Sequence, residues 1–184
     1  MKKVLVPLAP GCEELEAVTI VDILRRGDVV VVTAGLQAGP IKASRGILLT
    51  ADTPLSEAVG ANDFDMVVIP GGMAGSQALM DCPYFIEYLQ RMFKTGRLIG
   101  AICAAPMILG QAGLLNDLKF TAYPGVISPA DYPTAAYTGN AVEQDKNILT
   151  SRGPGTALDF ALAILEQLMG RETRDKVEEQ LVRP

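Results

Sequence analysis

The chain has 184 residues, of which 49% are hydrophobic and 20% are charged, and its formal net charge at pH 7 is -5. This length and composition are typical of one globular domain, over residues 1–184, that is long enough to bury a sizeable core. A negative net charge without a basic run argues against nucleic acid or an anionic membrane as a partner. No stretch reaches the roughly 20 apolar residues of a membrane span.

The content of cysteine and histidine narrows the chemistry further. The three cysteines, Cys12, Cys82 and Cys103, are widely spaced, and no histidine is present. This cysteine pattern favours free thiols in a reduced, cytoplasmic protein. The N-terminal segment agrees with that location, because it lacks the apolar length and the cleavage site of a signal peptide. The absence of histidine excludes Ser-His and Cys-His mechanisms and, without Cys-x-x-Cys spacing, argues against zinc. We therefore expect neither a metal nor a cofactor.

In the first half of the chain, buried strands are predicted to alternate with helices. Leu15, Val18, Val21 and Leu24 recur at helical spacing in the first helix and predict its buried stripe. This β-α-β beginning indicates a parallel strand pair with a right-handed crossover. The expected elements are a strand at 3–8, a helix at 13–26, a strand at 29–34, a hairpin within 41–50, a short helix at 52–59, a strand at 66–69 and helices at 75–80 and 83–94.

The second half continues the alternation. The expected elements are a strand at 98–102, a helix at 104–111, a strand at 119–122, a loop at 123–139, a hairpin of 141–142 with 148–150, a helix at 154–169 and a polar helix at 172–181. Most of the strands are continuous apolar runs, which is typical of parallel sheets buried on both sides. We predict an α/β fold whose mostly parallel sheet is covered by helices on both faces.

One cysteine lies where a strand is predicted to turn into a helix. Residues 98–102 form the strand, and Pro106 suits the first turn of the helix that follows, so Cys103 lies at the corner. A helix dipole and free backbone N–H groups stabilise a thiolate, which predicts a reactive cysteine with a lowered pKa. The alternative is a small, buried apolar residue, and the local pattern does not separate the two.

Two further segments are expected near this corner, because sites in parallel sheets lie beyond the carboxyl ends of the strands. Residues 9–11 and 70–72 also follow buried strands. Gly71 and Gly72 expose backbone N–H groups that could form an oxyanion hole beside Cys103, although a tight turn without function would have the same sequence.

Three carboxylates lie at the start of the first helix. Glu13 and Glu14 are explained by the helix dipole. Glu16 lies near the apolar stripe and could face a cleft, where desolvation would raise its pKa and allow it to donate a hydrogen bond to a thiolate or to exchange a proton with a substrate; its spacing alone does not separate this role from a structural one. Residues 151–156 are only superficially similar to a phosphate loop, because they lack its lysine and spacing, and a turn into a proline-started helix is favoured.

Four segments taken together resemble the ThiJ/PfpI superfamily, and within it the parkinsonism-associated deglycase subgroup and its bacterial relatives. The segments are Gly-Cys-Glu-Glu-Leu-Glu at 11–16, Pro-Gly-Gly at 70–72, Ala-Ile-Cys-Ala-Ala-Pro at 101–106 and Thr-Ser-Arg-Gly-Pro-Gly-Thr at 150–156. The resemblance covers essentially the whole chain, in order and with matching spacing. It implies a flavodoxin-like α/β sandwich that forms a homodimer.

The resemblance also implies roles for individual residues. Cys103 matches the nucleophile and redox-sensitive thiol, and Glu16 matches a protonated carboxyl that hydrogen-bonds to the sulfur. The backbone N–H groups of Gly72 and Ala104 match those that line the oxyanion pocket. Arg45 and Arg152 match positions near the dimer-side mouth of that pocket.

This sequence departs from the family at one position of the pocket mouth. Many relatives carry a histidine just before a proline near the cysteine, and here that place is taken by Tyr123 and Pro124. The Cys-His dyad of some superfamily branches is therefore absent. Tyr123 could donate a hydrogen bond, but it is a poor general base at neutral pH.

Two functions remain open because they share one site. In the first, implied by the subgroup's glyoxalase or deglycase activity, the Cys103 thiolate adds to a small 2-oxoaldehyde or to a glycated protein, Glu16 shuttles the proton, and a hydroxy acid leaves. In the second, the protein is a redox sensor or redox-regulated chaperone in which Cys103 is oxidised to a sulfinate. Hydrolase or amidotransferase chemistry is a distant option, because it generally needs a histidine base.

Overall fold

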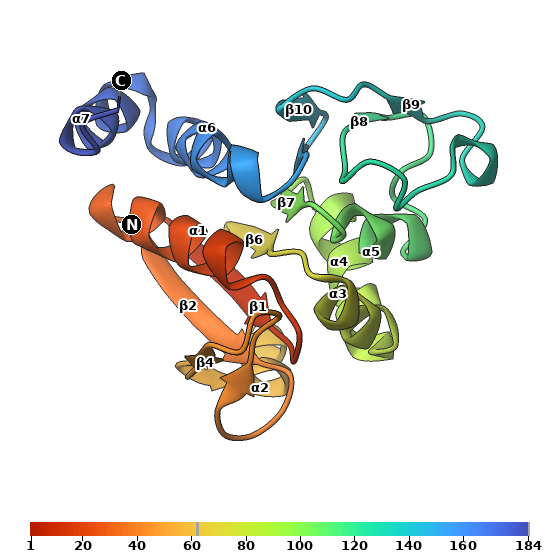
Figure 1. Cartoon of the computed structure of the whole chain (residues 1–184), viewed down its shortest axis with the longest axis horizontal. Coiled ribbons are helices and arrows are strands. Elements are labelled where there is room, and N and C mark those ends of the chain that lie inside the picture. Colours follow the sequence, from red (N-terminus) through yellow and green to blue (C-terminus); the bar gives the residue numbers. More distant parts are fainter. Residues whose placement is uncertain (62, 184) are drawn as a thin grey trace.

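The structure, a computed structural model, is built on a central sheet of seven strands (Figure 1). It describes residues 1–61 and 63–183, so Asn62 and Pro184, both within the predicted 1–184 domain, lie outside the described residues. Every neighbouring pair in the sheet is parallel except β10 with β11. The strand order is β10 (Val142–Asp145), β11 (Ile148–Ser151), β7 (Leu98–Ile102), β6 (Met66–Ile69), β1 (Lys3–Leu8), β2 (Val30–Gly35) and β5 (Thr53–Pro54).

Helices cover both faces of this sheet, and each face packs its own apolar cluster (Figure 1). One face carries α1 (Glu14–Arg26), α6 (Ala157–Met169) and α7 (Arg171–Gln180). The other carries α2 (Leu55–Ala61), α3 (Met73–Met80), α4 (Pro83–Lys94) and α5 (Pro106–Gln111). The predicted α/β sandwich with a mostly parallel sheet is therefore confirmed. In the described part of the chain, no helix combines the length and apolar character that crossing a bilayer requires.

Several small elements lie at or outside the edges of the sheet. β3 (Ile41–Lys42) and β4 (Leu48–Leu49) form the predicted hairpin, separate from the main sheet. The strand expected at 119–122 is shorter: β8 (Lys119–Phe120) pairs with β9 (Ala136–Tyr137) in a second small sheet. The expected loop at 123–139 thus contains β9, as well as the short 3-10 helix η1 (Pro129–Asp131), and a second one, η2 (Pro154–Thr156), precedes α6.

The helix expected at 52–59 begins later than predicted. Residues 53–54 form β5, which pairs with the end of β2, and α2 starts at Leu55. Pro54 cannot donate to a strand ladder, so it suits this outermost position in the sheet.

The predicted stripe of α1 was partly wrong. Leu15 and Val18 are 51% and 53% exposed, whereas Glu16 is fully buried. Apolar residues occur on two sides of this helix, and spacing alone does not tell which side faces the sheet. The side that packs inward carries Ala17, Ile20, Ile23 and Leu24 together with Glu16.

The carboxyl ends of three neighbouring strands, β1, β6 and β7, meet at one edge of the sheet. The N–H of Glu13, just beyond β1, donates to the carbonyl of Gly71, just beyond β6, over 2.9 Å. Cys103 follows β7 directly. The topology therefore brings together the three segments that the sequence places after buried strands.

Candidate active site

Cys103 lies in a tight corner between β7 and α5. Its φ of 64° falls in the left-handed region, which residues other than glycine seldom adopt and which costs about 1–3 kcal/mol. Two hydrogen bonds hold the corner: the N–H of Cys103 donates to the Ser151 carbonyl over 3.0 Å, and its carbonyl accepts from the Tyr123 N–H over 2.9 Å. The backbone thus directs this side chain beyond the edge of the sheet, as in other strained nucleophile corners.

Glu16 is fully buried on the side of α1 that faces the sheet. Its Oε2 accepts a hydrogen bond of 2.7 Å from the N–H of Gly71, and its own N–H donates to the Glu13 carboxylate, which caps α1, over 2.8 Å. Within the described residues, Oε1 has no well-aligned hydrogen-bond donor. The Cys103 thiol interacts with this carboxyl and lowers its pKa. The carboxyl is therefore held on one side by backbone and meets the thiol on the other.

Two glycines allow the chain after β6 to pass between these side chains. A Cβ atom at Gly71 would lie 2.6 Å from the Cβ of Cys103 and 2.8 Å from Oε2 of Glu16. Gly72 has a φ of 89°, and a Cβ there would collide with the carbonyl oxygen of Gly11. Position 71 requires glycine because the Cys103 and Glu16 side chains approach its backbone closely. Position 72 requires glycine because of its positive φ and because the Gly11 carbonyl leaves no space for a Cβ atom.

The charge state of the pair is set mainly by burial. Burial raises the pKa of Glu16 to about 7, and the hydrogen bond from the Gly71 N–H and the nearby Cys103 thiol offset this rise only in part. Burial also raises the pKa of the Cys103 thiol to about 12, and the charge of Glu16 adds to the rise. Hydrogen bonds from the N–H groups of Gly72 and Ala104 act in the opposite direction.

The expectation of a thiol with a lowered pKa was therefore wrong in direction. It considered the helix start and the free N–H groups, which do lower the pKa of Cys103, but not the apolar surroundings and the nearby carboxylate, which outweigh them. Near neutral pH, Glu16 loses its proton first and can then accept the one on the sulfur. Such a pair titrates as a unit, and its first proton is lost near pH 7.

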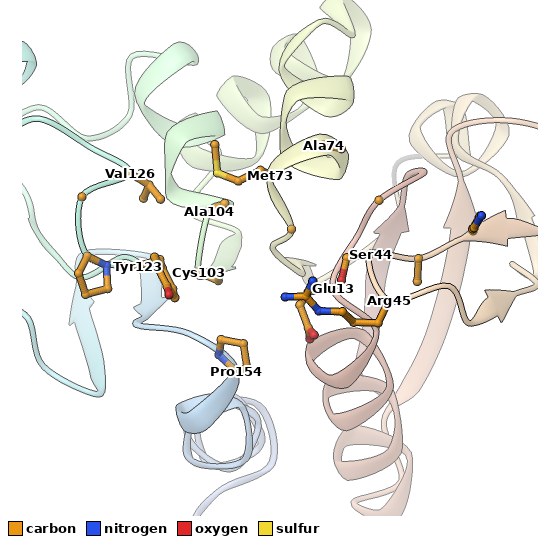
Figure 2. A pocket seen from close by; sticks show the side chains of 16 residues that line it. Glu13, Ser44, Arg45, Met73, Ala74, Cys103, Ala104, Tyr123, Val126 and Pro154 are labelled. Atoms are coloured by element: carbon orange, nitrogen blue, oxygen red, sulfur yellow. The ribbon is translucent and has the colours of Figure 1, made fainter.

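A cavity of about 690 Å³ opens over Cys103 (Figure 2). Figure 2 shows Cys103, Tyr123 and Pro154 on one side of the opening, with Glu13 and Arg45 on the other. Glu16 does not line the cavity. The remaining lining residues are Gly11, Lys42, Ala43, Ser44, Gly72, Met73, Ala74, Ala104, Pro124, Gly125 and Val126.

The structure thus brings together most of the predicted site residues. Gly72, Ala104, Arg45 and Tyr123 share the cavity with Cys103. Arg152 is the exception: it lines an adjoining hollow of about 510 Å³, which Tyr123 also lines, and donates to the carbonyl of Gly139 over 3.1 Å.

Sequence reasoning did not predict that one loop contributes Lys42, Ser44 and Arg45 together to the lining of the cavity. Only Arg45 was expected there, because no motif links this loop to the Cys103 corner and a hairpin outside the sheet can lie almost anywhere. Glu13 was assigned to the helix dipole, and it both caps α1 and lines the cavity. Among residues 1–61 and 63–183, no three cysteine, aspartate or glutamate side chains are grouped as a metal site requires.

A glycine substitution tests the close packing around the thiol. We expect Gly71→Ala to slow alkylation of Cys103 by on the order of tenfold or more, because the added methyl would displace the sulfur or the Glu16 carboxyl. Gly155→Ala is the matched control, since a Cβ there meets no atom within 4 Å. Alkylation is followed by mass spectrometry, and equal rates in the two variants would contradict the packing described here.

The pH dependence of thiol reactivity tests the shared proton. We expect alkylation of Cys103 to increase as pH rises through about 7, because the first proton leaves the pair there and the remaining one can move from sulfur to carboxylate. In Glu16→Gln this inflection should disappear, and reactivity should rise only at more alkaline pH. An unchanged inflection in Glu16→Gln would show that Glu16 is not the group that titrates.

Comparison with known proteins identifies the family of this chain. Residues 2–167 match the model of the DJ-1/PfpI family. The protein DJ-1alpha of Drosophila melanogaster is 44% identical over 177 residues, which cover 96% of this chain and 82% of the relative. A protein of Caenorhabditis elegans named glutathione-independent glyoxalase DJR-1.2 is 37% identical over 93% of this chain and 91% of the relative.

Solved structures show the same likeness in three dimensions. The crystal structure of Drosophila melanogaster DJ-1beta superposes with a TM-score of 0.93 at 38% sequence identity, covering 100% of this chain and 98% of that one. Oxidized DJ-1 of Toxoplasma gondii gives a TM-score of 0.92, also at 38% identity, covering 99% of this chain and 98% of that one. By sequence and by flavodoxin-like architecture, the chain belongs to the DJ-1/PfpI family.

Proposed function

We propose that the protein converts 2-oxoaldehydes, or their adducts on proteins, into hydroxy acids through the Cys103 thiol, with Glu16 as the proton shuttle and without a cofactor. The observation that carries this proposal is the buried Glu16 carboxyl, whose pKa is raised to about 7 and which meets Cys103 at the base of an open cavity. A relative named as a glutathione-independent glyoxalase supports the same reaction class.

The reaction begins with transfer of one proton. Ionised Glu16 takes the thiol proton as Sγ of Cys103 forms a bond to the aldehyde carbon, which gives a hemithioacetal. We assign the backbone N–H groups of Gly72 and Ala104 to the developing oxyanion, because both already act on the Cys103 sulfur and Ala104 and Gly72 line the cavity.

The second half of the reaction returns the thiol. Glu16 first passes the thiol proton to the oxyanion, which becomes a hydroxyl, and is ionised again. It then takes a proton from the former aldehyde carbon and returns it to the neighbouring keto carbon, while the hydroxyl proton passes to the keto oxygen, so that the hemithioacetal becomes a thioester of the hydroxy acid. Water then breaks the bond between carbon and sulfur, and Cys103 recovers its proton. The net change is addition of one water to the 2-oxoaldehyde. No outside oxidant, reductant or metal is consumed.

The assembly and location of the protein belong to the same proposal. Leu15 and Val18 expose an apolar side of α1, and Ile47 and Leu48 of the hairpin are 55% and 65% exposed. Apolar side chains of this size left in contact with water are typical of an interface. These exposed residues support the homodimer that the family resemblance implies. The free cysteines support a location in the cytoplasm, where thiols stay reduced.

Turnover of methylglyoxal tests the proposed enzyme directly. We expect Cys103→Ser to abolish formation of lactate, and Glu16→Gln to lower it by on the order of 10²–10⁴-fold, the usual contribution of a positioned proton carrier. Cys82→Ser is the control, because Cys82 lies at the N-cap of α4, where serine is favoured. Full activity in Cys103→Ser would refute the mechanism.

A second candidate, a redox sensor or redox-regulated chaperone, is favoured by the surroundings of the same sulfur. A protonated Glu16 and the N–H groups of Gly72 and Ala104 are donors that would stabilise the oxygens of a sulfinate. Cys103 is 8% exposed, compared with 2% for Cys12 and 6% for Cys82. Of these three cysteines, Cys103 is the one that lines the cavity.

Mild peroxide followed by peptide mapping tests this candidate. We expect two oxygen atoms to be added to Cys103 while Cys12 and Cys82 stay reduced, since neither of those thiols lines the cavity. In Glu16→Gln the sulfinate should form less readily, because the protonated carboxyl is gone. Equal oxidation of the three thiols would count against a special site.

A further inference from the structure

Glu14 is a buried carboxylate that takes no part in the proposed reaction. It lies in the first turn of α1 and is 5% exposed. Its Oε2 accepts a hydrogen bond of 2.7 Å from the Ser44 hydroxyl, and its Oε1 accepts one of 2.7 Å from the Arg45 N–H. Burial opposes the charged form, but hydrogen bonds that include those from Ser44, Arg45 and Ile47 hold the pKa of Glu14 below its usual value.

Backbone hydrogen bonds join the same loop to the segment before α1. The N–H of Ser44 donates to the carbonyl of Cys12, and the N–H of Gly11 donates to the carbonyl of Lys42, both over 2.8 Å. These bonds hold the loop through its backbone, at Lys42 and at Ser44. The carboxylate of Glu14 is the side-chain contact that fixes its tip, at Ser44 and Arg45.

The tip of this loop brings positive charge to the rim of the cavity. Lys42 and Arg45 line the cavity, and across residues 1–61 and 63–183 neither forms an ion pair. Figure 2 shows the Arg45 side chain extending from its loop toward Glu13, across the opening from Cys103. The lining of the cavity thus includes two cationic residues, Lys42 and Arg45, and one acidic residue, Glu13.

We propose that Glu14 is a positioning residue: its carboxylate holds the Ser44–Arg45 corner so that the Arg45 cation faces the entrance and favours reagents and substrates that carry an anionic group. The preference for an anionic substrate rests on the proposed function. The preference for an anionic reagent does not, because it concerns access to the Cys103 thiol, whichever reaction that thiol carries out. A glutamine at this position could still accept from the Arg45 N–H and donate to the Ser44 hydroxyl, but a neutral amide holds both groups more weakly than a carboxylate, so the tip of the loop would be held less firmly.

Alkylation with two reagents of similar shape and different charge tests this role. Iodoacetate is anionic and iodoacetamide is neutral, so the ratio of their rates at Cys103 reports the charge at the entrance. Glu14→Gln also removes a negative charge, which by itself would raise this ratio, so a fall in the ratio reports the displacement of Arg45. We expect a fall of about two- to fivefold in Glu14→Gln. Arg45→Gln should also lower the ratio, and the double variant should show no further loss relative to Arg45→Gln.

Two comparisons separate positioning from general damage. Asp22→Asn, on the same helix, removes a carboxylate that pairs with Arg26 over 2.9 Å, far along α1 from the loop, and should leave the ratio unchanged. Ser44→Ala keeps the Glu14 charge and the hydrogen bond from the Arg45 N–H, and removes only the hydroxyl donor, so it should lower the ratio by a smaller amount. High salt should reduce the wild-type ratio toward that of Glu14→Gln.

The outcomes that would overturn the proposal are distinct. An unchanged ratio in Glu14→Gln would refute it, and so would equal slowing with both reagents, which would show that Glu14 supports only the fold. Independent, additive effects of Glu14→Gln and Arg45→Gln would also refute it. The test needs no turnover, so a protein inactive on methylglyoxal that shows the expected ratios would contradict the proposed enzyme and still support the role of Glu14.

Discussion

The contact between a buried carboxyl and a thiol is the constraint on which the rest of the site depends. An ionised carboxylate that is fully buried and accepts a single backbone hydrogen bond is costly, so Glu16 is pushed toward its protonated form. Cys103 is likewise pushed toward its protonated form. Because an ionised Glu16 opposes ionisation of the thiol, the pair loses one proton readily but not two. Gly71 makes this contact possible, since any larger residue would occupy the space between them.

The first turn of α1 distributes three carboxylates among three tasks. Glu13 caps the helix and fixes the backbone at Glu16, whose side chain points inward to the thiol. Glu14 points toward the loop after β3 and holds its tip. Successive helical residues differ by about 100° in direction, so neighbours in sequence reach different partners. One turn of helix therefore connects the base of the cavity to its rim, and a shift of α1 would disturb both.

Much of the fold and part of the site could be predicted from the sequence. Apolar runs alternating with helical periods were enough for the parallel sheet, and Pro106 after a buried strand placed Cys103 at its corner. The buried face of α1 was not predictable, because Leu15 and Val18 continue a helical stripe that the structure leaves exposed. The pKa of Cys103 was misjudged because desolvation depends on tertiary surroundings. The 42–45 loop was missed because its position rests on long-range hydrogen bonds.

The left-handed backbone at position 103 has a consequence for how substitutions there should be interpreted. A glycine would fit this conformation with less strain than any residue that carries a Cβ. The folded state therefore gives up some stability to keep a side chain at the corner. A β-branched residue would fit worst of all, whereas asparagine and aspartate adopt this region more readily than other residues with a side chain. In a lineage that no longer needed the sulfur, replacement of cysteine by glycine would be favoured, because it relieves the backbone strain at position 103.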